Sequence, residues 1–208
     1  DGLWYPGTAT KSCAASYRWY RDTFGGDFKE LDEAAAALPV GAEGLLFHPY
    51  LSGELTPYAD PMLCGSFTGI RAGHTRAHFS RAVLEGVALS LLDCKTELEK
   101  IGIPHDEKAT VIGGGGKSPV WRQMLADMYD CHVKTVAQTE GPALGAAILA
   151  GVGCGIYESV EAACDALISA DKTTGPEENQ AGLYKKYHQL YKELYEDLKG
   201  SYKKLAAL

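Results

Sequence analysis

The chain has no surplus of basic residues. Its 20 Lys and Arg stand against 27 Asp and Glu, which gives a formal net charge of −7. Binding to the phosphate backbone of nucleic acid draws on an excess of Lys and Arg, so this balance argues against a nucleic-acid partner. Two basic pairs, Lys185-Lys186 and Lys203-Lys204, are separated by acidic residues, and we interpret them as a solvated helix face.

Long apolar runs and leader patterns are also missing. No stretch reaches the roughly 20 apolar residues that span a bilayer. The first residues, from Asp1 onward, carry no charged, apolar and small-residue leader. We therefore expect a soluble, cytoplasmic protein with no membrane partner, and we interpret the chain as a piece of a longer protein.

Cysteine pairs at metal-binding or redox spacing are absent. In a chain of 208 residues, long enough to bury a substantial core, scattered cysteines predict reduced thiols instead of a disulfide framework or a zinc site. His74 and His78 stand one helical turn apart, but no Glu follows His74 as H-E-x-x-H requires. We assign no metal site. The six cysteines are Cys13, Cys64, Cys94, Cys131, Cys154 and Cys164.

What the chain does have is a run of four glycines between a predicted strand and a predicted helix. The β-branched run 110–112 is typical of a buried strand, and residues 113–116 are all glycine. Ser118 and Pro119 then occupy N-cap and first-turn positions of a helix expected over 120–129. Bare backbone beside a helix start suits a nucleotide. A purely structural turn is the alternative.

Neither of the two common phosphate loops fits this stretch. The P-loop pattern G-x-x-x-x-G-K-[ST] requires a glycine where Val111 stands. The dinucleotide pattern G-x-G-x-x-G requires a third glycine at the position of Ser118 or Pro119. The residues alone therefore leave both a nucleotide site and a purely structural turn open.

Strand and helix patterns alternate along the chain, which predicts an α/β layered domain. The small residues of the segment 142–151 indicate close packing against its neighbours, and the tyrosine stripe of the last helix indicates core packing. Strands are expected at 44–48, 66–70, 110–112 and 132–136, and helices at 10–24, 28–38, 75–101, 120–129, 142–151, 158–170 and 177 to the end.

Three acidic residues are candidates for a functional or structural role because of their positions. Glu54 and Asp60 belong to the long loop 49–61, and ordered loops of that length are usually functional. We interpret Asp60 as a turn residue whose carboxylate bonds nearby backbone N–H groups. Glu85 lies among apolar residues of the helix expected at 75–101, so it either pairs with a buried partner or lines a cleft.

The order of these motifs resembles the C-terminal domain of the FGGY family of carbohydrate kinases, and within it the xylulokinases. The resemblance covers about Ala14 to the C-terminus. Residues 65–70, seven further residues and 78–85 fit the family's second signature, and 49–57 with Asp60-Pro61 looks like the pentulose-kinase loop before it. Residues 113–123 are similar to the adenosine motif, and 143–147 to the alanine-rich helix after it.

The resemblance implies a ribonuclease H-like fold of the actin/hexokinase superfamily, with a mixed sheet flanked by helices. Residues 1–208 would form the C-terminal, ATP-side domain of a sugar kinase whose N-terminal domain and upstream part are missing. By residue matching, Gly113, Gly114 and Gly115 would lie against the adenosine and α-phosphate of ATP. Gly116 replaces a usual alanine, and Ser118 falls where a polar side chain contacts the adenine end.

The resemblance also implies MgATP as the phosphoryl donor and a ketopentose, foremost D-xylulose, as the acceptor, held mostly by the missing domain. Complete members of the family are often dimers, so the resemblance leaves open that the complete protein forms a homodimer. Cys64 stands where an Arg is common. At an upstream nucleotide contact Ala14 replaces a glycine and Arg18 a glutamine.

The catalytic residues of the family would lie outside this chain. Family members carry a D-x-G-T phosphate loop and a catalytic Asp before this region, and the sequence contains neither. Phosphoryl transfer needs a positioning acid and organised Mg²⁺, so we assign no catalytic residue and expect the fragment alone to be inactive. The alternative is a non-enzymatic nucleotide-binding module of the same fold, such as a sugar-sensing regulator. A third hypothesis is a structural, actin-like subunit.

Overall fold

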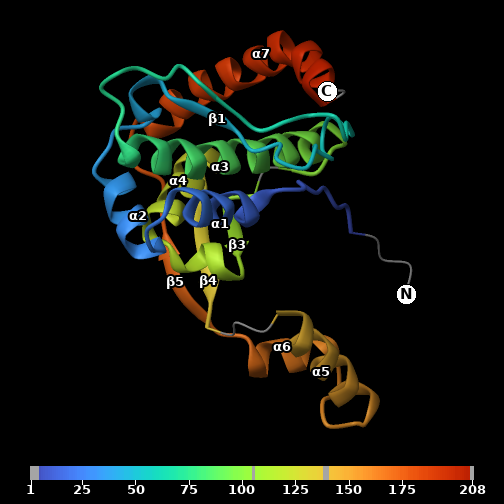
Figure 1. Ribbon diagram of the computed structural model, residues 1–208. Coiled ribbons are helices and arrows are strands. Elements are labelled where there is room, and N and C mark those ends of the chain that lie inside the picture. Colours follow the sequence, from blue (N-terminus) through green and yellow to red (C-terminus); the bar gives the residue numbers. More distant parts are fainter. Residues whose placement is uncertain (1–4, 105, 138–140, 207–208) are drawn as a thin grey trace.

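The computed structural model describes residues 5–104, 106–137 and 141–206. Helix α3 (Arg76–Lys100) crosses the middle of the main body (Figure 1). Helix α7 (Gln180–Ala206) lies on one side of α3 with the strand pair β1 (Leu46–His48) and β2 (Ser66–Thr68). On the other side lie α1 (Cys13–Phe24), α2 (Phe28–Ala36), α4 (Pro119–Tyr129) and the strands β3 (Lys108–Val111), β4 (His132–Val136) and β5 (Ala170–Thr174).

The three-stranded sheet is mixed and has the order β3-β4-β5. Strands β3 and β4 are parallel, with Lys108 opposite His132, while β4 and β5 are antiparallel. Strands β1 and β2 form a separate antiparallel pair. The predicted alternation of strands and helices is therefore confirmed, with the sheet placed beside α4.

The predicted helix 158–170 is wrong at its C-terminal end. Helix α6 covers only Val160–Leu167, and the residues from Ala170 to Thr174 form β5. Most side chains of β5 are exposed, so the strand lacks the apolar alternation that marks a half-buried strand. Its backbone pairing with β4 holds it in place instead.

Helix α3 is buried on almost every side over its middle turns. A Cβ at Gly86 would overlap the carbonyl of Phe47, so the glycine lets β1 lie directly on the helix. The stripe predicted for α7 does pack into the core, where Tyr184, Tyr191 and Tyr195 are buried. The two long helices thus form the core that supports everything else.

Glu85 pairs with a buried partner, which settles the alternative that the sequence left open. It lies 2.8 Å from Nε of Arg81 and accepts hydrogen bonds from the backbone N–H of Gly41 and from the hydroxyl of Tyr184. Burial raises the pKa of Glu85, and the guanidinium of Arg81 opposes that shift. The residue joins α3 to α7 and does not face a cleft.

The alanine-rich helix α5 (Gly141–Gly153) does not pack as predicted. Together with α6 it projects from the main body (Figure 1). Ile148 and Gly151 are its buried residues among those described, and Leu149 is largely exposed. Helix α5 packs against α6, and a Cβ at Gly151 would lie 3.0 Å from the ring of Tyr157 in the turn after the helix.

Candidate nucleotide site

The glycine run forms a turn followed by a short 3-10 helix. After β3 the backbone of Gly113 has a φ of 80°, in the region that favours glycine. Residues Gly114–Lys117 form the 3-10 helix η2, and α4 begins directly after Ser118. As predicted, Ser118 is the N-cap: its Oγ accepts a hydrogen bond from the backbone N–H of Trp121 at 3.2 Å. Pro119 is the first residue of the helix.

The four glycines have different surroundings. At Gly114 no described atom lies within 4 Å of where a Cβ would stand, so its backbone is bare. At Gly115 a Cβ would overlap the ring of Trp121. Gly116 is buried, and a Cβ there would lie 3.3 Å from the carbonyl oxygen of Val111. Gly114 therefore offers backbone to a ligand, Gly115 leaves room for the ring of Trp121, and Gly116 allows close packing against the sheet.

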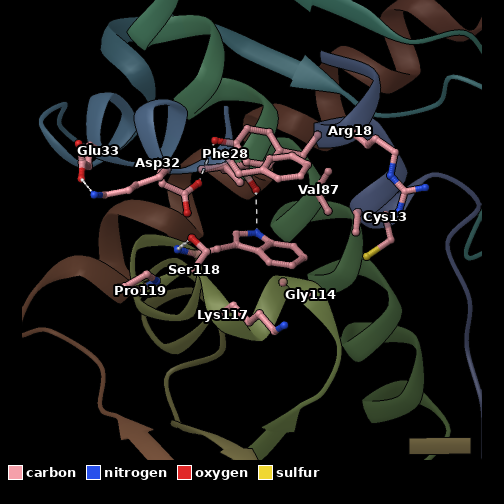
Figure 2. Close-up of a pocket in the computed structure, with 16 residues that line it drawn as sticks. Cys13, Arg18, Phe28, Asp32, Glu33, Val87, Gly114, Lys117, Ser118 and Pro119 are labelled. Carbon is pink, nitrogen blue, oxygen red and sulfur yellow. Dashed lines mark hydrogen bonds and ion pairs between the residues drawn. The ribbon is translucent and has the colours of Figure 1, made fainter. Parts of the chain in front are cut away.

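A cavity of about 620 Å³ opens beside Gly114 and Gly115. One wall comes from α1 and α2, which each contribute residues at i, i+1, i+4 and i+5, the spacing of one helix face. Figure 2 shows this arrangement. The wall consists of Cys13, Ala14, Tyr17 and Arg18 from α1 and of Phe28, Lys29, Asp32 and Glu33 from α2. The other side consists of Leu84, Val87, Gly114, Gly115, Lys117, Ser118, Pro119 and Trp121.

The sequence prediction is only partly reflected in this cavity. Gly114, Gly115 and Ser118 line it, as do Ala14 and Arg18. Gly113 and Gly116 are outside its lining and shape the turn that presents the other two. Whether these residues bind a nucleotide stays a prediction.

Two buried side chains of α4 hold the cavity floor in place. The indole N–H of Trp121 donates to the backbone carbonyl of Leu84 at 3.2 Å, which fixes the ring against Gly115. The guanidinium of Arg122 donates to the carbonyl of Gly116 at 2.6 Å. Both contacts restrict the turn before any ligand arrives, and such preorganisation favours binding.

Charged groups are distributed unevenly around the cavity. Asp32 and Glu33 lie at the end next to Ser118, Arg18 lies at the other end, and Lys117 lies beside Gly114 (Figure 2). A third lining cation, Lys29, lies 3.9 Å from Glu33. The hydroxyl of Tyr17 donates to Oδ1 of Asp32 at 2.9 Å. Burial raises the pKa of Tyr17, and Asp32 raises it further, so this hydroxyl stays protonated and remains a donor.

Sequence reasoning missed Trp121, Tyr17, Phe28 and Asp32 as cavity residues. The helical spacing of α1 and α2 was visible, but spacing does not say which face meets the glycine turn. Trp121 follows the N-cap by three residues, and only tertiary packing shows that its ring lies against Gly115.

The acids of the loop 49–61 have structural roles on another face. Glu54 is buried and accepts hydrogen bonds from the hydroxyls of Thr10 and Ser90 and from the backbone N–H of Lys11. The carboxylate of Asp60 accepts from the backbone N–H of Met62 at 2.9 Å, so the predicted turn role is confirmed. That hydrogen bond lowers the pKa of Asp60.

Residues 5–104, 106–137 and 141–206 contain no cluster of three His, Cys, Asp or Glu side chains arranged to hold a metal ion. His78 is engaged at the start of α3, where its Nδ1 accepts from the backbone N–H of Thr75 at 3.0 Å. Its Nε2 lies 3.3 Å from Glu43. No helix in the described part of the chain is both long and apolar enough to span a membrane.

Residues 1–154 match the family described as "FGGY family of carbohydrate kinases, C-terminal domain". Among curated proteins, the xylulose kinase of Staphylococcus epidermidis (strain ATCC 12228 / FDA PCI 1200) is 39% identical over 199 residues, which cover 94% of this chain and 40% of that protein. The gluconokinase of Bacillus licheniformis is 32% identical over 218 residues, covering 99% of this chain and 42% of that protein.

A solved structure agrees with these sequence relatives. The ligand-bound xylulose kinase from Lactobacillus acidophilus superposes with a TM-score of 0.86 at 28% identity, over 94% of this chain and 40% of that one. The chain thus spans about two fifths of the length of the kinases it matches. The predicted fold class is confirmed: an α/β, ribonuclease H-like C-terminal domain of the actin/hexokinase superfamily, with a mixed sheet flanked by helices.

Proposed function

This chain belongs to the FGGY family of carbohydrate kinases, as the match over residues 1–154 shows, and from that premise we propose that it binds ATP as part of a longer kinase. Residues 1–208 are then the C-terminal, ATP-side domain. The sugar and the catalytic base are held by the part of the protein that precedes it. The reaction is transfer of the γ-phosphoryl group of MgATP to a sugar hydroxyl.

The observation that carries this proposal is the cavity beside Gly114 and Gly115. It combines bare backbone, a helix N-terminus and a flat indole surface in one place. Bare glycine backbone lets phosphate groups approach closely, and a flat apolar surface beside the helix start suits an aromatic base. For Mg²⁺ the described residues offer no carboxylate cluster, so we assign it no ligand in this chain.

For the acceptor we propose a ketopentose, with D-xylulose converted to D-xylulose 5-phosphate. The basis is the 39% identity to a xylulose kinase, compared with 32% to a gluconokinase. Gluconate is therefore the second candidate. We further propose that the complete protein works in the cytoplasm and forms a homodimer, as its resemblance to the family implies.

Calorimetric titration with ATP and ADP tests the nucleotide site directly. Gly114→Val places a branched side chain into open space in the cavity, so it should block binding without disturbing the fold. Gly73→Val is the matched control, because Gly73 also has open space around it but lies outside the cavity lining. We expect binding to the wild type and to Gly73→Val, and at least tenfold weaker binding to Gly114→Val.

Equal binding by all three proteins would place the nucleotide elsewhere and overturn the proposed site. Phosphoryl transfer by the complete protein to a panel of pentuloses, hexuloses and gluconate identifies the acceptor. A complete protein that binds nucleotide but phosphorylates no sugar would favour the alternative, a non-enzymatic nucleotide-binding module.

A further inference from the structure

Asp32 presents an unused hydrogen-bond acceptor to the cavity. It lies on α2, is partly buried and lines the cavity at the end near Ser118 (Figure 2). Its Oδ1 accepts from the hydroxyl of Tyr17 at 2.9 Å, which fixes the orientation of the carboxylate. None of the described residues donates a hydrogen bond to Oδ2. One oxygen is thus held in place while the other is available to a ligand.

The other acid at this end is not available in the same way. Glu33 is exposed and lies 3.9 Å from Nζ of Lys29, one helical turn before it on α2. That pair is a solvated i,i+4 contact of small energetic weight. Asp32 is therefore the acid at this end whose carboxylate is held in a fixed orientation.

Lys29 lies beside Glu33 at the acidic end, and the other two cations of the lining lie away from it. Arg18 and Lys117 line the cavity from α1 and η2, and neither forms an ion pair with a residue that the structure describes (Figure 2). A ligand that satisfies both ends carries hydrogen-bond donors at one end and negative charge at the other. A nucleoside triphosphate with an amino-bearing base has that form, with its phosphates toward the two cations.

We propose that Asp32 selects the base: its Oδ2 accepts a hydrogen bond from the 6-amino group of adenine, while the phosphates extend toward Arg18 and Lys117. This inference rests on the proposed function and specifies the base that the site takes. A base with an oxygen at position 6 would place two acceptors against each other. A site that hydrogen-bonds a ligand group discriminates strongly against analogues that lack it.

The ratio of kcat/KM for ATP to that for ITP in the complete kinase tests the proposal. Hypoxanthine, the base of ITP, has an oxygen where adenine has the amino group. Purine riboside 5′-triphosphate, which has only hydrogen there, isolates the loss of the amino group. A hydrogen bond to a charged group predicts a preference for ATP of at least about tenfold over either analogue.

Asp32→Asn is the informative variant, because its Oδ1 can still accept from Tyr17 while its amide group donates to an oxygen at position 6. We expect its ATP-to-ITP ratio to fall at least tenfold, with the KM for sugar unchanged. Glu30→Gln is the control, because Glu30 is an exposed acid of the same helix outside the cavity lining, and its ratio should equal that of the wild type. A purely structural role for Asp32 would lower both rates together and leave the ratio unchanged.

Two other results separate this inference from the function on which it rests. The first is a wild-type protein that transfers phosphoryl from ATP but has nearly equal kcat/KM values for ATP and ITP. This result, which needs no variant, would overturn the role of Asp32 and leave the kinase assignment standing. A folded complete protein that transfers phosphoryl from none of these nucleotides would overturn the proposed function and this inference with it.

Discussion

His48 is a histidine that the fold keeps neutral. It is fully buried at the end of β1, and its Nε2 donates to the backbone carbonyl of Tyr191 on α7 at 3.0 Å. Its Nδ1 has no hydrogen-bond partner among the described residues. A protonated ring would carry a second N–H with no acceptor, and burial disfavours the charged form. Burial therefore lowers the pKa of His48 from 6.5 to about 4. The ring stacks between aromatic neighbours instead, including Tyr50.

Because of His48, the free energy of unfolding should decrease as the pH falls. Between pH 6.5 and pH 4 the unfolded chain takes up a proton at His48 that the folded chain refuses, so stability is complete above pH 6.5 and falls as the pH decreases. The loss amounts to at most about 3 kcal/mol. Urea unfolding of the wild type and of His48→Gln, each at pH 7 and pH 4.5, measures it.

The side chain introduced by His48→Gln cannot ionise. The stability that this variant loses on acidification should therefore be smaller than the loss in the wild type by about this amount. His132→Gln, which replaces an exposed histidine, is the control and should follow the wild type. Identical pH dependence in all three proteins would show that His48 does not contribute to acid sensitivity.

At the residue scale the sequence predicts best what depends on near neighbours. Ser118 and Pro119 were predicted in their places because a helix start requires only the residues that follow it. The turn role of Asp60 has the same local origin. Gly115 differs, because the reason for a glycine there is the ring of Trp121, whose position depends on its hydrogen bond to Leu84 on another helix.

At the scale of elements, the N-terminus of α4 combines a structural role with a proposed binding role. The Oγ of Ser118 accepts from the backbone N–H of Trp121, which leaves the hydroxyl proton free to donate to a nitrogen of the base. Ser159 caps α6 in the same way, accepting from Ala162 at 3.1 Å, but lies outside the cavity lining. The chain therefore contains a matched pair of N-caps.

Alanine at either cap should lower the free energy of unfolding by about 1 kcal/mol. Only Ser118→Ala should also raise the dissociation constant for ATP, by roughly three- to tenfold, because only that hydroxyl faces the cavity. Thermal unfolding and calorimetric titration of both variants check the two parts. Unchanged ATP affinity in Ser118→Ala would limit Ser118 to capping the helix.

Among the elements, those with strong periodicity were predicted and the exposed strand was not. The amphipathic pattern of α7 predicts both its helical state and its buried face, whereas the pattern of α3 predicts the helix but not that its middle turns are buried on almost every side. Strand β5 has exposed side chains, so nothing in its composition distinguishes it from the end of a helix. The sequence also could not predict that α5 projects from the main body, because small residues permit close packing but do not require it.

At the scale of the whole molecule, one domain contains the whole of the cavity that we propose for the nucleotide. The cavity is built within residues 13–121, from α1, α2, α3, η2 and α4. The sequence has no D-x-G-T phosphate loop, and the described residues present no carboxylate cluster for a metal ion. The kinases it matches are about two and a half times as long, since the chain covers 40% of their length.

We therefore expect the 208-residue chain to bind ATP without transferring its phosphoryl group. Positioning of the acceptor is worth up to about 10⁵–10⁸ M in effective concentration and general-base help about 10²–10⁴ in rate, and the chain supplies neither. ADP release in the presence of D-xylulose and MgATP should stay at the level of buffer. The complete protein should release ADP in proportion to the D-xylulose phosphorylated.

A contaminating host kinase could imitate activity in this assay, and the Gly114→Val chain separates the two cases. Activity from a contaminant persists in the variant preparation, whereas activity of the chain itself is lost with its nucleotide site. Sugar-dependent ADP release that scales with the wild-type chain and disappears in Gly114→Val would show that this domain transfers phosphoryl alone. The catalytic groups would then have to be sought among the residues that line the cavity, with Asp32 the first to be replaced.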